Sequence, residues 1–128
     1  MVAETGGVTP APDKFHRELE ALKDRLLELA GLAGKAIELG VKAFMKRDED
    51  LAQQIILGDR VVNELEETID SECVRLIALF QPVAIDLRQV MAVNHISAEL
   101  ERIGDSATNI AEEVLVLNPI LSLTSFSI

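Results

Sequence analysis

The chain has 128 residues and a formal net charge of −10, and 48% of its residues are hydrophobic although only 3% are aromatic. A chain of this length forms one domain with its own core, and Leu, Ile, Val and Ala must fill that core, as they do in helical bundles. The negative charge argues against a nucleic-acid partner, since nucleic-acid binding needs clustered Lys and Arg. It favours basic proteins or metal ions as partners instead.

Residues 1–12 are small and mostly polar, and they lack the apolar core of a signal peptide, so we expect a flexible leader there. No apolar run in the chain reaches the roughly 18–20 residues of a membrane-spanning helix. The single cysteine, Cys73, has no partner for an internal disulfide, which fits a reducing compartment. These features predict a cytoplasmic protein without a transmembrane segment.

Apolar residues recur every three or four positions through three successive segments, which predicts amphipathic helices near residues 13–47, 49–80 and 82–117. The connections between them are short, so neighbouring helices must run antiparallel. The predicted fold is therefore all-α, an up-down-up three-helix bundle with long helices. In the third helix, the residues expected to face the core are Ile96, Leu100, Ile103, Ala107, Ile110, Val114 and Leu117.

Pro119 is expected to end the third helix, because proline has no backbone N–H to donate. The chain beyond the helix, residues 118–128, contains no charged residue and remains apolar. An apolar tail of this kind needs a cover. We therefore expect either that the tail is used in self-association or that the chain is truncated.

Acidic and amide side chains form two stripes, one beside the predicted core positions of the second helix and one beside those of the third. The first stripe consists of Asp59, Asn63, Glu66 and Asp70, and the second of Glu101, Asp105, Thr108 or Asn109, and Glu112. The candidate metal ligands among them are Asp59, Asn63, Glu66, Glu101, Asp105 and Glu112. Within each stripe the members are three, four or seven residues apart, which places them on one face of a helix. Stripes on adjacent helices that face each other would offer oxygen ligands for Mg²⁺, Mn²⁺ or iron. Acids that merely solvate a half-exposed helix edge explain the pattern about equally well.

Three blocks of sequence carry a family resemblance. Residues 59–66 read Asp-Arg-Val-Val-Asn-Glu-Leu-Glu, residues 81–88 read Gln-Pro-Val-Ala-Ile-Asp-Leu-Arg, and residues 100–105 read Leu-Glu-Arg-Ile-Gly-Asp. In their order and spacing, these blocks resemble the PhoU family of bacterial phosphate-uptake regulators. The resemblance extends over residues 13–117.

The resemblance implies a fold and a set of metal ligands. PhoU proteins are two tandem three-helix bundles, of which this chain matches one, and they can bind metal clusters through Glu/Asp-x-x-x-Asp motifs. Glu101 and Asp105 match that motif, and Asp59 with Asn63 takes the partner position on the second helix, with Asn in place of the second Asp. Glu66 and Glu112 are further candidates. The ion implied is Fe, Mn, Mg or Zn.

The resemblance also implies a function, that of a non-enzymatic regulator of phosphate uptake and phosphate-starvation signalling. Such a regulator acts as a metal-binding adaptor on the ATPase subunit of the phosphate transporter and on a sensor histidine kinase, and reaches the membrane only through these partners. We expect a homodimer or higher oligomer. One alternative is a metal-free interaction module. A carboxylate-bridged di-metal enzyme is a more distant one, because the chain has no Glu-x-x-His motif.

Overall fold

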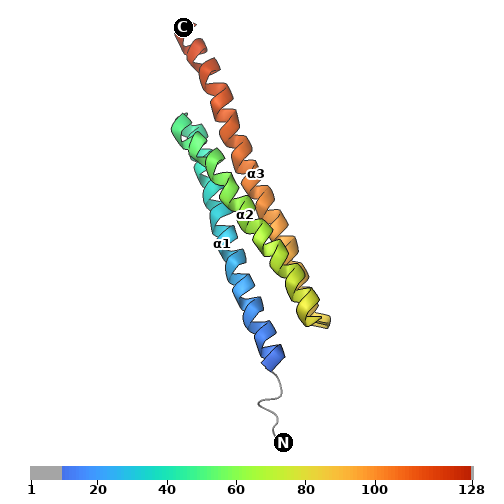
Figure 1. The fold of residues 1–128 in the computed structure, drawn as a ribbon. Coiled ribbons are helices and arrows are strands. Elements are labelled where there is room, and N and C mark those ends of the chain that lie inside the picture. Colours follow the sequence, from blue (N-terminus) through green and yellow to red (C-terminus); the bar gives the residue numbers. More distant parts are fainter. Residues whose placement is uncertain (1–9, 128) are drawn as a thin grey trace, which may run out of the picture.

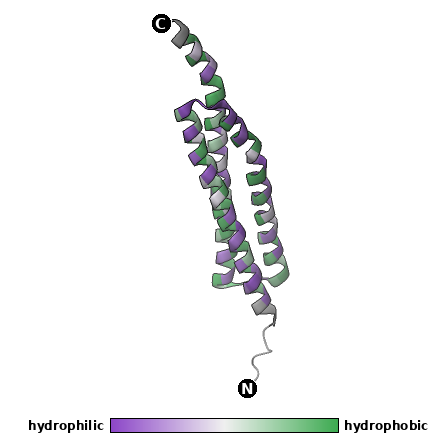
Figure 2. Cartoon of the chain, turned by 90° about the vertical axis from the view of Figure 1, so that its left-hand side faces the viewer, coloured by the Kyte–Doolittle hydropathy of each residue, from purple (hydrophilic) through white to green (hydrophobic). Residues whose placement is uncertain are grey.

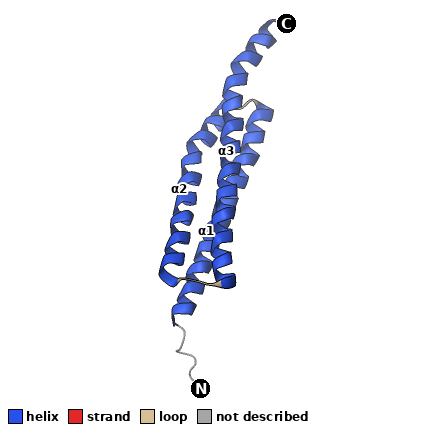
Figure 3. Ribbon diagram, turned by 90° about the vertical axis from the view of Figure 1, so that its right-hand side faces the viewer, coloured by secondary structure: helices blue, strands red, loops and turns tan. Residues whose placement is uncertain are grey.

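The computed structural model describes residues 10–127 of the backbone and the side chains of residues 14–123, and all three of its secondary-structure elements are helices. They are α1 (Pro10–Lys46), α2 (Glu49–Phe80) and α3 (Ala84–Ser127). The helices lie side by side in an up-down-up bundle (Figures 1, 2 and 3), so the predicted all-α fold is confirmed. Residues 1–9 of the expected leader lie outside the described residues. No helix within residues 10–127 has both the length and the apolar character needed to cross a bilayer.

The turn between α1 and α2 is closed by Asp48. Its side chain accepts a hydrogen bond from the Leu51 backbone N–H at 3.0 Å, which caps the amide end of α2. Arg47, just before it, has a left-handed backbone with φ of 55°. α2 therefore begins at Glu49, as the sequence predicted.

Three predicted boundaries differ from the structure by two residues or more. α1 begins at Pro10 rather than at residue 13, consistent with the preference of proline for the first helical position. α3 begins at Ala84 rather than at residue 82, because Gln81 and Ala84 both have left-handed backbones and Pro82 therefore lies in the turn. The third difference is the end of α3.

Pro119 does not end α3, and the prediction that it would was wrong. The helix continues to Ser127 and extends beyond the turn that joins α1 to α2 (Figure 1). The buried residue Asn118 donates from Nδ2 to the Arg47 carbonyl oxygen at 2.8 Å, and Arg47 Nη2 donates to the Asn118 carbonyl oxygen at 3.4 Å. These contacts fix α3 where proline removes a helical hydrogen bond. We call residues 119–127 the overhang.

The predicted core face of α3 was also partly wrong. The buried residues of α3, together with the half-buried Leu100, follow a strict spacing of three and four: Val90, Val93, Ser97, Leu100, Gly104, Ala107, Ala111, Val114 and Asn118. Two of the large residues expected there are partly exposed instead, Ile96 at 44% and Ile103 at 40%. Small residues occupy the adjoining core positions because α1 and α2 approach α3 closely. A Cβ built on Gly40 of α1 would lie 3.4 Å from the Ala107 carbonyl oxygen.

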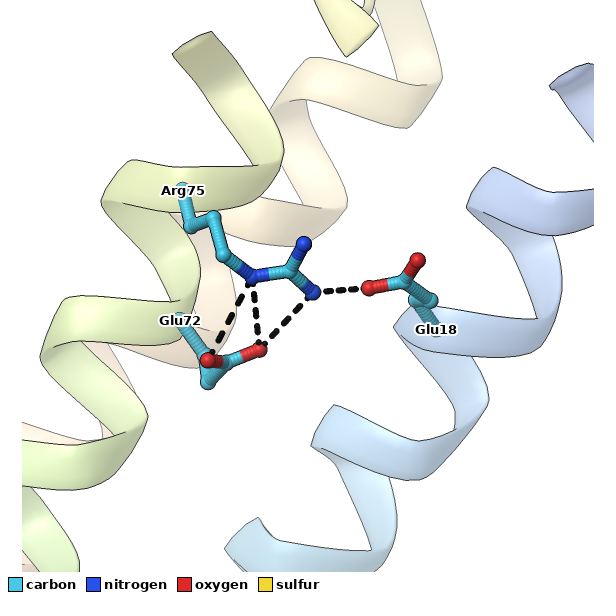
Figure 4. A network of polar contacts seen from close by, with 3 residues as sticks. All are labelled: Glu18, Glu72 and Arg75. Atoms are coloured by element: carbon cyan, nitrogen blue, oxygen red, sulfur yellow. Dashed lines mark hydrogen bonds and ion pairs between the residues drawn. The ribbon is translucent and has the colours of Figure 1, made fainter. Parts of the chain in front are cut away.

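Large apolar side chains from α1 and α2 fill the rest of the core, including Leu19, Leu29, Ile69 and Leu76. Polar contacts reinforce the surface between the helices. Arg75 of α2 bonds Glu72 on its own helix and Glu18 on α1 (Figure 4). Such partly exposed ion pairs contribute little stability each, so the apolar core is the main source of the fold's stability.

Candidate metal site between α2 and α3

Five of the six candidate residues come together on the edge where α2 meets α3. Gly104 makes this possible, because its lack of a side chain lets the two helices approach. A Cβ built on Gly104 would lie 3.0 Å from Val62 Cγ1 and 3.7 Å from Asp59 Oδ1. Asp59 of α2 therefore lies against the backbone of α3 immediately before Asp105.

The first pair in this cluster lies on α2. Asn63 Nδ2 donates to Asp59 Oδ2 at 3.2 Å, across one turn of the helix. This bond commits the amide nitrogen, while the other end of the amide, Asn63 Oδ1, is buried and has no hydrogen-bond partner among the described residues. A buried acceptor without a donor costs on the order of 1–3 kcal/mol. A cation or an ordered water beside Asn63 would remove that cost.

The second pair lies on α3. Burial raises the pKa of Glu101 above its ordinary value, and a hydrogen bond with Asp105 raises it further. The negative charges of Asp105, Glu66 and Asp59 add to the increase in this pKa. Glu101 thus lies within the field of three other carboxylates from two helices. A metal ion beside these carboxylates would relieve that repulsion.

Glu66 continues the cluster toward the α2–α3 turn. Its pKa is raised, first by burial and then by the charges of Asp70 and Glu67. Asp70 in turn accepts a hydrogen bond from Asn94 of α3. Asn94 was not among the residues that the sequence predicted for this cluster, although it lies seven residues before Glu101 and therefore on the same face of α3.

Glu112 is not part of the cluster. It is exposed, and it lies seven residues beyond Asp105, about 10 Å along the helix axis. The charges that raise the pKa of Glu101 belong to Asp105, Glu66 and Asp59, and Glu112 is not among them. The regular spacing of the acids on α3 therefore predicted more members than the structure brings together.

Among the described residues, no three His, Cys, Asp or Glu side chains lie close enough together to hold a metal ion as they stand. The side chains pair within each helix instead, Asp59 with Asn63 on α2 and Glu101 with Asp105 on α3. The donor atoms themselves are carboxylate and amide oxygens, which suit Mg²⁺, Mn²⁺ or iron. They lack the thiolate and imidazole ligands that Zn²⁺ sites mostly use. The chemistry of this cluster therefore fits a hard, oxygen-loving cation.

A cavity of about 250 Å³ opens beside Asp59, and residues of all three helices line it. Its walls are mainly apolar, with Leu32, Ala36 and Ile55 among them, and Gly104 and Thr108 of α3 contribute to it. Asp59 borders both this cavity and the carboxylate cluster. Asp59 is the one candidate ligand among the residues that line this cavity.

Comparison with known proteins gives a consistent result. Residues 26–114 match the PhoU domain. The chain is 41% identical over 104 residues to a phosphate-specific transport system accessory protein PhoU homolog of Aquifex aeolicus, with 81% of this chain and 47% of that protein covered. It is also 41% identical over 102 residues to the accessory protein PhoU of Escherichia coli K12, with 80% of this chain and 42% of that protein covered.

Solved structures agree with the sequences. The fold matches the crystal structure of PhoU from Pseudomonas aeruginosa with a TM-score of 0.78 and 40% identity, covering 80% of this chain and 49% of that one. PhoU from Streptococcus pneumoniae matches with a TM-score of 0.75 and 34% identity, covering 79% and 48%. The chain thus spans about half the length of the relatives it matches. The matched domain, the sequence identity and the shared helical bundle together show that this chain belongs to the PhoU family.

Proposed function

We propose that this chain is a non-enzymatic regulator of phosphate uptake and phosphate-starvation signalling. The observation that carries the proposal is its 41% identity to proteins named phosphate-specific transport system accessory proteins. As an adaptor in the cytoplasm, it would contact the ATPase subunit of the phosphate transporter and a sensor histidine kinase, and would restrain both when phosphate is plentiful. We also propose that it self-associates.

The regulatory role is tested in cells that lack the corresponding gene. Expression of this chain should lower phosphate uptake and the activity of a starvation-controlled reporter in phosphate-rich medium. The negative control is Gly104→Trp, because a tryptophan side chain does not fit where α2 and α3 approach each other this closely. Unchanged uptake and reporter activity with the wild-type chain, at the same expression level as an active relative, would contradict the role.

We propose further that Asp59, Asn63, Glu66, Glu101 and Asp105 bind a divalent or iron ion between α2 and α3. Two features support this proposal: the unsatisfied Asn63 Oδ1, and the crowding of carboxylates that raises the pKa of Glu101. The ion would reduce the repulsion among the carboxylates and fix one acidic face for partner binding. In the competing interpretation, a metal-free interaction module, these acids only solvate the helix edges.

Metal binding is tested by elemental analysis of the purified chain and by thermal melts with Mn²⁺, Fe²⁺ and Mg²⁺. We expect retained metal and a higher melting temperature for the wild type, and neither for Asp105→Asn. Glu112→Gln is a matched control because it removes a carboxylate from the same helix outside the cluster. An Asp105→Asn variant that binds and melts like the wild type would favour the metal-free module.

A further inference from the structure

The cavity beside Asp59 is large enough to hold a small organic molecule. Its volume of about 250 Å³ exceeds the roughly 150 Å³ of an apolar protein cavity that holds a benzene ring. Ile55 and Val62 of α2, both buried, form part of its wall. Leu32 and Ala36 of α1, both half-buried, face them across the cavity or lie beside them in the same lining. An occupant that uses these walls needs an apolar body of about the size of a benzene ring.

Two glycines contribute to the lining of the cavity, Gly58 from α2 and Gly104 from α3. A Cβ built on Gly58 would meet no atom within 4 Å, so a larger side chain at this position has room. Gly31 of α1 has equally open surroundings but does not line the cavity. A leucine at position 58 therefore reduces the cavity, and a leucine at position 31 leaves it unchanged.

One carboxylate oxygen at the cavity is available to an occupant. Asp59 Oδ2 accepts a hydrogen bond from Asn63 Nδ2 at 3.2 Å, whereas no described residue donates to Asp59 Oδ1. Oδ1 lies 3.7 Å from the position of a Cβ built on Gly104, which belongs to the cavity wall. An N–H group of an occupant can therefore donate to this oxygen.

The other polar side chains that line the cavity are engaged elsewhere or lie in solvent. Thr108 Oγ1 donates to the Gly104 carbonyl oxygen at 3.2 Å on its own helix. Lys35 Nζ lies 3.8 Å from Glu38 Oε1, and the Lys35 side chain is 66% exposed. Gln54 is exposed. Among the described residues, Asp59 thus has no cationic partner of its own.

Charge selects a cation as the polar end of the occupant. Asp59 belongs to the carboxylates that raise the pKa of Glu101, together with Glu66 and Asp105, and the whole chain carries a net charge of −10. An anionic group would be repelled beside these acids. An aliphatic amine is protonated at neutral pH, and its ammonium group brings both a positive charge and hydrogen-bond donors.

We propose that this cavity binds a small organic amine, in which a primary ammonium group is joined to a compact apolar body. The apolar body lies among Leu32, Ile55 and Val62, and the ammonium group donates to Asp59 Oδ1. A bare metal ion would leave the apolar walls unused, and a neutral hydrocarbon would leave the carboxylate unpaired. This inference goes beyond the proposed function, because it adds a ligand that uses the apolar cavity as well as the acidic edge.

The probe is phenethylamine, titrated into the whole chain in the presence of EDTA and followed by NMR of the Leu, Ile and Val methyl groups. We expect the methyl signals of Leu32, Ile55 and Val62 to shift, with a dissociation constant of roughly 0.1–1 mM for a ligand of this size. Phenethyl alcohol has nearly the same shape without the charge, and it should bind about tenfold more weakly. Absence of these shifts at 10 mM amine, or equal affinity for the alcohol, would overturn the proposal.

Variants test the two halves of the site, with circular dichroism to confirm folding. Asp59→Asn should weaken amine binding about tenfold and leave the alcohol unchanged, because only the amine uses the charge. Glu112→Gln is its matched control, since it removes an exposed carboxylate outside the cavity. Gly58→Leu should weaken both ligands at least tenfold, and Gly31→Leu should weaken neither. Amine binding that is unchanged by both Asp59→Asn and Gly58→Leu would overturn the site.

These measurements use neither a metal ion nor a phosphate-transport protein. An amine that fails to bind would thus leave the proposed metal site and the regulatory role standing. A chain that binds the amine in EDTA but retains no metal would contradict the metal site alone.

Discussion

Glu101 experiences more negative charge than an isolated helical glutamate, and its ionisation opposes folding. Its pKa is higher in the folded chain than in the unfolded chain, so the folded state binds this proton more tightly. The resulting stabilisation is complete below the ordinary pKa of Glu and disappears as the pH rises through the raised pKa. At neutral pH without metal, the carboxylate therefore destabilises the bundle.

Replacing Glu101 by glutamine should stabilise the metal-free chain. At pH 7.5 we expect Glu101→Gln to unfold at a higher temperature than the wild type, because glutamine carries no charge to be repelled by the neighbouring carboxylates. The difference should shrink as the pH falls to 4, because wild-type Glu101 is then protonated. Calorimetry at several pH values measures both effects. Glu112→Gln should show no such stabilisation, and an equal gain from it would indicate that general charge reduction is the cause.

At the scale of the helices, the glycines of the chain have different roles. A Cβ on Gly104 would lie 3.0 Å from Val62 Cγ1, whereas a Cβ on Gly31 would meet nothing within 4 Å. We expect Gly104→Ala to lower the free energy of unfolding by about 1–2 kcal/mol through overpacking. Gly31→Ala should raise it by up to about 1 kcal/mol through helix propensity. Urea unfolding of both variants measures the difference, and two changes of the same sign would contradict a close approach at Gly104.

Asn118 should be the residue that makes proline tolerable inside α3. It donates to the Arg47 carbonyl oxygen and, at 3.2 Å, to Glu49 Oε2. Asn118→Ala should lower the free energy of unfolding by about 1–3 kcal/mol, because it leaves the Arg47 carbonyl without its donor. Hydrogen exchange should show the loss of protection concentrated beyond Val114. Asn109→Ala, at an exposed position on the same helix, is the control.

The sequence predicts where the helices lie better than it predicts which residues of each helix face the core. Hydrophobic spacing identifies three helices because it depends only on each residue's neighbours along the chain. It does not identify Ser97, Gly104 or Ala111 as core residues, since their burial depends on how closely another helix approaches. The end of α3 was wrong for the same reason, because Asn118 bonds a residue 71 positions away. The acidic cluster was predicted in part, since helical spacing gives the face of each residue but not its distance across to α2.

At the scale of the whole molecule, net charge is a source of instability. The chain carries −10 at pH 7 and has an isoelectric point near 4.6. Mutual repulsion of surface charges disfavours the folded state, and salt screens it within about 10 Å at 0.1 M. We expect the melting temperature at pH 7.5 to rise when NaCl increases from 20 to 300 mM. The rise should nearly vanish at pH 5, and a rise of equal size at both pH values would rule out this cause.

The regular spacing of three and four along α3, from Val90 to Asn118, makes the helix sensitive to insertions and deletions. Each added residue would rotate everything beyond it by about 100°. One extra residue after Ser97 would turn the edge that carries Glu101 and Asp105 away from α2. It would also turn Ile103 out of line with Ile96, which lies before the insertion. An insertion of seven residues would restore both arrangements. Lineages of this chain should therefore tolerate changes of length in the overhang and in the turns, and between Val90 and Asn118 only as whole heptads.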